Sequence, residues 1–161
     1  MLPEFPLDTL LDTWDRHNAV LINLARLVPA AGLQARALPG SPTVAAMFSH
    51  MHHERMVSVQ ENAPEHAGAM PATEWNDAGD VETITAQLAA SGACVRAAVA
   101  GRVSAGRPFD LDYAHPTQLV SFLIFHEGYH HGQIKLALKA AGMPISDAEA
   151  GPATWKLLRV R

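Results

Sequence analysis

Cysteine is nearly absent from the sequence, since Cys94 is the only one and no disulfide can form within the chain. Such a composition favours a reducing compartment. Runs of lysine or arginine are also lacking, and the net charge is −4. Because nucleic-acid phosphates require a basic surface, we do not expect nucleic acid to be a partner.

Long hydrophobic runs are missing as well. No apolar segment approaches the roughly 18 residues that a transmembrane helix needs. The stretch MLPEFPLDTLLDTWDRH is acidic and lacks the basic start and apolar run of a signal peptide. We therefore expect a soluble, cytoplasmic protein that does not contact a membrane. With 161 residues, of which 48% are apolar, the chain is expected to form one domain over residues 1–161.

Strand patterns are absent too, because apolar and polar residues nowhere alternate over a strand's length. Apolar residues instead recur every three or four positions in four segments, at about residues 7–28, 42–60, 81–103 and 116–141. Helix-boundary residues frame them: we expect caps at Ser41, Asp80 and His115, and a stop at Gly142. The sequence thus predicts an all-α protein, an antiparallel four-helix bundle.

Two further segments have a predicted role in this bundle. Residues 61–79 contain prolines and glycines and are expected to form a loop, in which Trp75 folds back over the core. The tail, residues 145–161, is expected to add a short C-terminal helix that places Trp155, Leu157 and Leu158 against the bundle.

The segment FHEGYHHGQ, residues 125–133, allows two interpretations. As H-E-x-x-H it is a zinc-protease motif with Glu127 as general base, and Glu149 lies at a spacing suited to a third ligand. That motif requires a preceding strand, which the sequence does not predict. Alternatively, His126 and His130 are two metal ligands in a helical bundle. Residues four apart on a helix point the same way, so both imidazoles can reach one ion.

The predicted second helix supplies further histidines in FSHMHHERM. His50 lies on a stripe beside the apolar face and is the best candidate for a third ligand. His53 is the reserve, Glu54 could also add a fourth ligand, and His52 should point elsewhere. Three imidazoles with one open position would suit zinc or nickel. The remaining histidines are expected to be ordinary surface or helix-end residues, or to lie just outside the site: His17, His66, His115 and His131.

The segments FHEGYHHGQIKLALKAAGMP and SPTVAAMFSHMHHE together resemble the DinB-like superfamily, also called YfiT-like. Members are four-helix bundles with one histidine on the second helix and H-x-x-x-H followed by x-G-Q on the last long helix. The resemblance implies a metal site formed by His50, His126 and His130, and frequent homodimers. It also implies transfer or isomerisation chemistry with small thiols in members whose reaction is assigned.

These observations lead to a main functional hypothesis and two alternatives. In the first, a divalent metal activates a water or a low-molecular-weight thiol for transfer to a small electrophilic substrate. Glu127 or Glu54 is then a candidate base, although Glu127 is more simply a solvated residue, and Tyr129 could donate a hydrogen bond. The alternatives are a bundle that binds metal without turnover, and an H-E-x-x-H metalloprotease. A metal-free helical interaction module is a further possibility.

Overall fold

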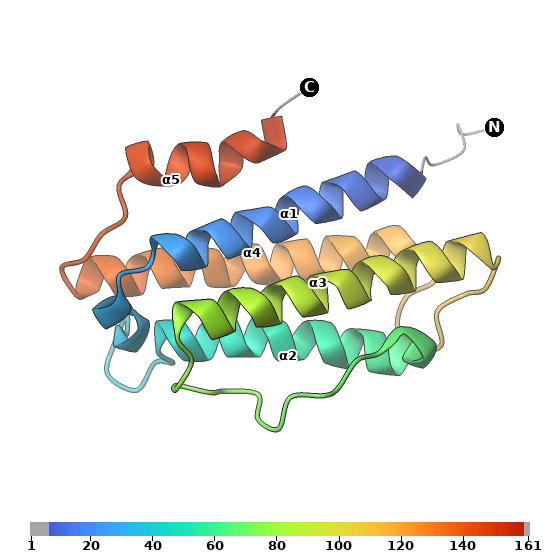
Figure 1. Cartoon of the computed structure of the whole chain (residues 1–161), viewed down its shortest axis with the longest axis horizontal. Coiled ribbons are helices and arrows are strands. Elements are labelled where there is room, and N and C mark those ends of the chain that lie inside the picture. Colours follow the sequence, from blue (N-terminus) through green and yellow to red (C-terminus); the bar gives the residue numbers. More distant parts are fainter. Residues whose placement is uncertain (1–6, 160–161) are drawn as a thin grey trace.

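The computed structural model describes residues 7–159, and all of the regular secondary structure in that range is helical (Figure 1). Residues 1–6 of the acidic N-terminal stretch, and the last two residues of the tail, lie outside it. The α-helices are α1 (Leu7–Leu27), α2 (Val44–Asn62), α3 (Val81–Ser104), α4 (Pro116–Ala140) and α5 (Asp147–Ala153). The short 3-10 helices are η1 (Ala30–Gln34), η2 (Pro64–His66) and η3 (Trp155–Arg159). The all-α prediction is confirmed.

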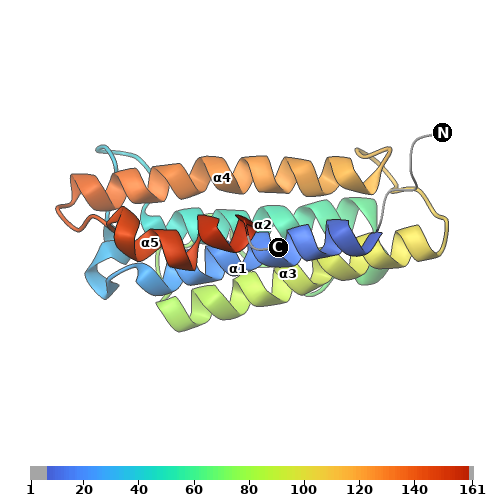
Figure 2. The same ribbon diagram turned by 90° about the horizontal axis from the view of Figure 1, so that it is seen from above.

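The four long helices pack as a bundle in which α1 and α2 each contact both α3 and α4. Helix α1 runs antiparallel to α3, and α2 runs antiparallel to α4 (Figures 1 and 2). Helices α2 and α3 run in the same direction, because the long segment between them returns along the bundle before α3 begins (Figure 1). This return segment passes close to α2 and supplies part of the site described below.

The helix boundaries follow local capping interactions. The Asp80 carboxylate accepts a hydrogen bond from the Thr83 backbone amide, and the His115 side chain caps α4, as predicted. The cap of α2 is Thr43 and not Ser41, so that prediction was wrong. The Thr43 hydroxyl accepts from the Ala46 amide at 3.0 Å, while Ser41 takes part in the turn before the helix.

The interior contains two apolar clusters with a polar layer between them. One cluster joins the end of α1 to the start of α2 and the end of α4. The other joins the start of α1 to the end of α2 and the start of α4. Between them, each of these three helices buries a polar side chain: His17, Arg55 and Glu127. Because burying such groups is costly unless they are paired, this layer must contain its own partners.

The predicted C-terminal helix is present, and Trp155 packs against one of the apolar clusters. Leu158 is exposed, so its predicted place against the bundle was wrong. Trp75 does not cover the core either, because it is partly exposed and lies against a histidine of α2. No helix in the described part of the chain combines the length and apolar character that a membrane span requires.

Candidate metal centre

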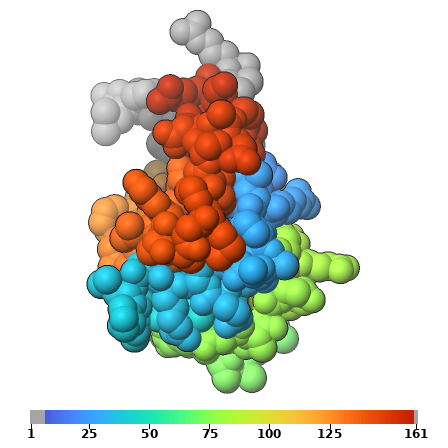
Figure 3. Space-filling model, turned by 90° about the vertical axis from the view of Figure 1, so that its left-hand side faces the viewer, coloured from blue at the N-terminus to red at the C-terminus, as the bar shows by residue number. Residues whose placement is uncertain are grey.

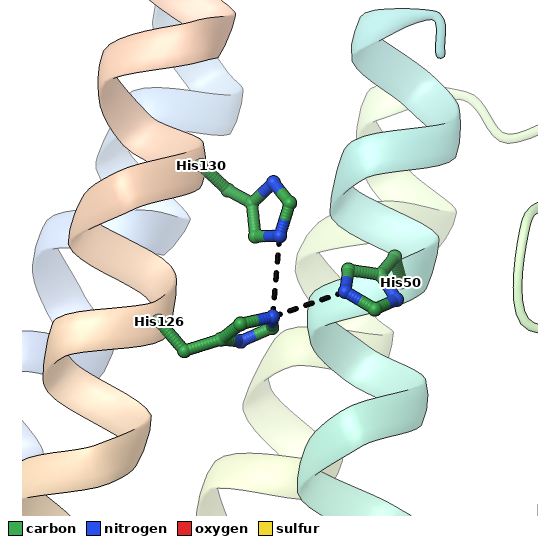
Figure 4. Close-up of side chains that lie close together, drawn as sticks. All are labelled: His50, His126 and His130. Atoms are coloured by element: carbon green, nitrogen blue, oxygen red, sulfur yellow. Dashed lines mark hydrogen bonds between the residues drawn. The ribbon is translucent and has the colours of Figure 1, made fainter.

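Three histidines from two antiparallel helices converge near the middle of the bundle. Their rings point toward one another, His50 from α2 and the pair His126 and His130 from α4 (Figure 4). The Nε2 atom of His126 lies 3.0 Å from Nε2 of His50 and 3.2 Å from Nε2 of His130. One nitrogen of each of the three residues therefore falls within 4.8 Å of those of the other two. The sequence predicted this grouping.

The spacing of these nitrogens fits a divalent transition metal. Nitrogens about 2.0–2.1 Å from a tetrahedral zinc ion lie about 3.3 Å from one another. The separations of 3.0 and 3.2 Å from Nε2 of His126 are close to that value, and the nitrogens of His50 and His130 lie within 4.8 Å of each other. A neutral imidazole carries one ring proton, so Nε2 of His126 cannot donate to both neighbours at once. A cation placed between the three lone pairs would satisfy them together, so the group could hold a metal ion.

Burial favours the uncharged state that ligation requires. It is the main cause that lowers the pKa of His50, His126 and His130 below the ordinary value of 6.5. Repulsion from a neighbouring histidine lowers each pKa further. Neutral rings present free nitrogen lone pairs at neutral pH, and only these can bind a metal.

The segment between α2 and α3 completes the surroundings of His50. The Nδ1 atom of His50 lies 2.8 Å from Oε1 of Glu74, and the Trp75 ring stacks on the imidazole at 4.1 Å between centroids. A carboxylate on the far nitrogen of a ligating histidine fixes the orientation of the ring and makes it a stronger donor. The structure thus adds Glu74 and Trp75 to the site. Neither belongs to a periodic segment, so the sequence offered no signal for them.

Glu127 lies next to His126 in the chain but faces the interior. It is fully buried, which overturns the expectation of a solvated residue. Its Oε1 accepts from Nε of Arg55 at 2.5 Å, and its Oε2 accepts from Nη2 of Arg55 at 2.9 Å and contacts Nε2 of His17 at 2.6 Å. Both carboxylate oxygens are therefore occupied by partners. The role of Glu127 as a general base stays a prediction that this geometry does not favour.

Electrostatics agree with an ionised Glu127. Burial alone would raise its pKa, but the charge and hydrogen bonds of Arg55, with a further hydrogen bond from His17, lower the pKa to about 2. Arg55 is itself fully buried and also donates to the side chain of Asn18 and to the backbone carbonyl of Leu88. Its guanidinium carbon lies 4.8 Å from the Trp14 ring centroid. These contacts form a satisfied polar layer behind the three histidines.

The sequence contained a signal for this layer. Arg55 follows the inward-facing Met51 by four residues and precedes the buried Val59 by four, so it shares their face of α2. Glu127 follows the buried Leu123 by four residues on α4. A basic and an acidic residue on the inner faces of two neighbouring helices indicate a buried ion pair. His17, which we expected to be ordinary, is buried as the third member.

The other ligand candidates stay apart from the cluster. Within residues 7–159, the metal-ligating side chains that converge are His50, His126 and His130, and neither His53 nor Glu54 joins them. His52 is buried toward α3, which agrees with the prediction that it points away from the site. Glu149 bonds Ser146 in the capping box of α5. With no preceding strand in the described range and Glu127 turned inward, the metalloprotease interpretation lacks its structural context.

A pocket of about 490 Å³ borders the cluster on the side of His130. Trp75 and Tyr129 form two of its walls, and the Tyr129 ring centroid lies 5.1 Å from that of His130. The rest of the lining comes from α4, from α2 and from the segment that leads into α2: Ala37, Leu38, Ser41, Pro42, Met47, Gln133 and Leu136. An ion held by the histidines would therefore lie beside a space suited to a small molecule.

Comparison with known proteins agrees with this geometry. A family model described as the DinB superfamily matches residues 13–134, well over half of the chain, and the match includes all three histidines. A search of curated proteins and a search of solved structures each found no match.

Proposed function

The chain belongs to the DinB superfamily, and on that basis we propose that it is a metal-dependent enzyme acting on a small molecule. His50, His126 and His130 would hold a divalent transition metal, zinc or nickel. When bound, the ion would lower the pKa of a water or of a low-molecular-weight thiol and so supply a nucleophile near neutral pH. The nucleophile would then be transferred to an electrophilic substrate in the adjoining pocket.

The observation that carries this proposal is the incomplete set of protein ligands. Three histidines converge, and neither His53 nor Glu54 closes the site. Catalytic zinc sites keep a position for water or substrate, whereas structural sites are closed by four protein ligands. A pocket beside His130 further supports catalysis over the alternative of a bundle that binds metal without turnover.

The chain's own residues would orient the reactants. Glu74 would hold the His50 ring through Nδ1, leaving Nε2 directed at the ion. Trp75 would cover the same ring and, together with Tyr129, exclude water from one side of the pocket. The cytoplasm, which the single cysteine favours, would keep a thiol co-substrate reduced.

Elemental analysis of protein purified without an affinity tag tests the metal site. We expect about one equivalent of a transition metal in the wild type and loss of metal in His50→Ala and His130→Ala. The matched control is His53→Ala, which removes a histidine of α2 that lies outside the cluster and should retain metal. Stoichiometric metal that survives either ligand substitution would refute the site.

Cobalt substitution separates a thiol from a water nucleophile. Addition of 2-mercaptoethanol to the cobalt-loaded protein should produce a sulfur-to-cobalt charge-transfer band if a thiol occupies the open position. A spectrum unchanged by saturating thiol, but shifted by pH, would favour activation of water instead. His53→Ala again serves as the control for histidines outside the cluster.

We also propose that the homodimer expected from the resemblance uses the outer face of α4. Large apolar side chains are exposed on this helix at spacings of three, four and seven residues, at Phe122, Phe125, Tyr129 and Leu136. Phe125 is 78% exposed. The stripe carries no charge and runs past the pocket that Tyr129 and Leu136 line, so a second copy could cover it by two-fold symmetry without burying an ionised group.

A further inference from the structure

The pocket beside His130 is lined without a single ionisable side chain other than His130 itself and the Tyr129 phenol. No lysine, arginine, aspartate or glutamate contributes to the lining. Its walls are aromatic and aliphatic, chiefly Trp75, Tyr129 and Leu136. Besides His130 and Tyr129, its polar side-chain groups are the hydroxyl of Ser41, the amide of Gln133 and the indole N–H of Trp75. These groups can form hydrogen bonds but cannot neutralise an ionised ligand.

Arg36, which precedes the lining residue Ala37 in the chain, already has partners of its own. Arg36 donates to the backbone carbonyl of Ser41, and its other terminal nitrogen lies 3.9 Å from an Asp77 carboxylate oxygen. Asp77 in turn accepts a hydrogen bond from the Thr43 hydroxyl. Arg36 and Asp77 therefore pair with each other, and neither contributes a charge to the lining.

From this lining we propose that the part of the substrate that does not touch the metal is an uncharged, aryl or bulky alkyl group. The inference rests on the proposed function, because it assumes that the reacting group is held at the three histidines. Transfer of an ionised carboxylate or phosphate into such walls, without a partner, is strongly disfavoured. An aromatic group would instead bury apolar area against Trp75 and Tyr129 and gain ring contacts.

The volume agrees with a substrate of this kind. A pocket of about 490 Å³ falls in the range that binds small organic ligands and exceeds what one bound water or a single small thiol requires. The space lies on the His130 side of the cluster. If the reacting group of a substrate is held at the ion, the rest of the substrate would lie between Trp75 and Leu136. Figure 3 shows the end of the molecule where the segment preceding α2 meets the last turns of α4.

Hydroxamates, which chelate zinc through a small head group, provide the test. Zinc-loaded protein is titrated with acetohydroxamate, biphenyl-4-hydroxamate and the 4′-carboxylated form of the latter. We expect the biphenyl compound to bind at least tenfold more tightly than acetohydroxamate, and the carboxylate to abolish most of that gain. A biphenyl tail that improves binding less than threefold, or a carboxylated tail that binds equally well, would overturn the proposal.

A charge introduced into the lining gives a second, independent readout. Leu38 lies at the pocket edge and is 69% exposed, so Leu38→Arg should fold normally and should restore binding of the carboxylated compound by about tenfold. Leu111→Arg is the matched control, because Leu111 is 70% exposed and does not line the pocket. Equal effects of both substitutions would show that the pocket does not hold the tail.

The same design distinguishes failure of the metal site from failure of the pocket. If acetohydroxamate does not bind, or zinc is not retained, the proposed function fails. The tail is then tested alone, as biphenyl-4-methanol against biphenyl-4-carboxylate, through quenching of Trp75 fluorescence relative to a Trp75→Phe control. Preference for the neutral alcohol would support the inference about the pocket, and lack of preference would refute it.

Discussion

Arg55 on α2 and Glu127 on α4 form a two-point ion pair with no exposed side-chain surface, at 2.5 and 2.9 Å. Arg55 follows His50 by five residues, and Glu127 directly follows His126. The pair therefore joins the same two helices that supply the metal-ligand candidates. We infer that it fixes the position of α2 relative to α4, and with it the approach of His50 to the other two histidines.

Removal of one partner should strongly destabilise the fold, because the other charge is then buried without compensation. We expect Arg55→Ala to lower the free energy of unfolding by about 3–5 kcal/mol, measured by urea denaturation. The control is Arg96→Ala, which breaks an exposed pair with Asp15 and should cost less than about 1 kcal/mol. Equal costs for the two substitutions would contradict the prediction.

A double substitution separates stability from ligand positioning. Arg55→Met combined with Glu127→Leu removes both charges and should recover part of the stability that Arg55→Ala loses, since His17 then lacks its partner Glu127. We nevertheless expect its zinc affinity, measured by competition with a chelator, to fall, because α2 and α4 lose the buried contact that fixes His50 relative to the other two histidines. Unchanged affinity in a stable double variant would mean that the pair has no part in positioning the histidines.

The helices were predictable because they depend on local apolar periodicity. The three ligand candidates were predictable because their spacing along each helix places them on a known face. The inward direction of Glu127 was missed, although its spacing from Leu123 indicated it. A helical face is wide enough for His126 and Glu127 both to border the interior. A charged residue there is buried only if it has a partner, and Arg55 lies 72 residues away in the sequence. That pairing depends on tertiary packing.

The course of residues 63–80 was also beyond prediction. Composition identified this segment as a loop, but not that it returns along the bundle and makes α2 and α3 parallel (Figure 1). Because of that path, Glu74 and Trp75 arrive at His50. Nothing periodic marks either residue, so their part in the site follows only from the fold.

A pH-dependent contribution to stability is expected far from the metal centre, at the buried Arg102. Its guanidinium donates to both carboxylate oxygens of Asp110, at 2.7 and 2.9 Å. This hydrogen bonding holds the pKa of Asp110 below its usual value of 3.8. A lowered folded-state pKa stabilises the fold above the ordinary pKa, and that contribution is lost as the pH falls through the folded-state value.

The melting temperature of wild type and Asp110→Asn, measured from pH 7 to pH 2.5, tests this. The wild type should be the more stable at pH 6, and the difference should shrink below about pH 4 as Asp110 becomes protonated. Asp112→Asn is the control, since Asp112 is not among the hydrogen-bond partners of Arg102 in the described part of the chain. A difference that stays constant over the whole range would contradict the assignment.

The proposed α4 interface makes a prediction about oligomeric state. Phe125→Lys should convert a dimer into a monomer, because it places a charge in the middle of an apolar contact. Light scattering after size-exclusion chromatography measures the mass directly. Leu111→Lys, at an exposed leucine outside α4, should leave the dimer intact. A wild type that is monomeric at high concentration would refute the interface itself.

Glu74 offers the sharpest test of whether the loop takes part in the site. Its carboxylate lies 2.8 Å from Nδ1 of His50, while the ring's other nitrogen faces His126. Loss of the carboxylate would free the ring to rotate and weaken it as a donor, so Glu74→Ala should reduce zinc affinity by about 10–100-fold. Glu74→Gln retains a hydrogen-bond acceptor, so its zinc affinity should lie between that of the wild type and that of Glu74→Ala. Glu82→Ala, at the exposed start of α3, should not change the zinc affinity. Because Glu74 is itself partly exposed, its substitution should leave the free energy of unfolding of the metal-free protein nearly unchanged. Affinity and stability that fall together in Glu74→Ala would instead indicate a general loosening of the loop, and His50 would then have no specific need of its carboxylate partner.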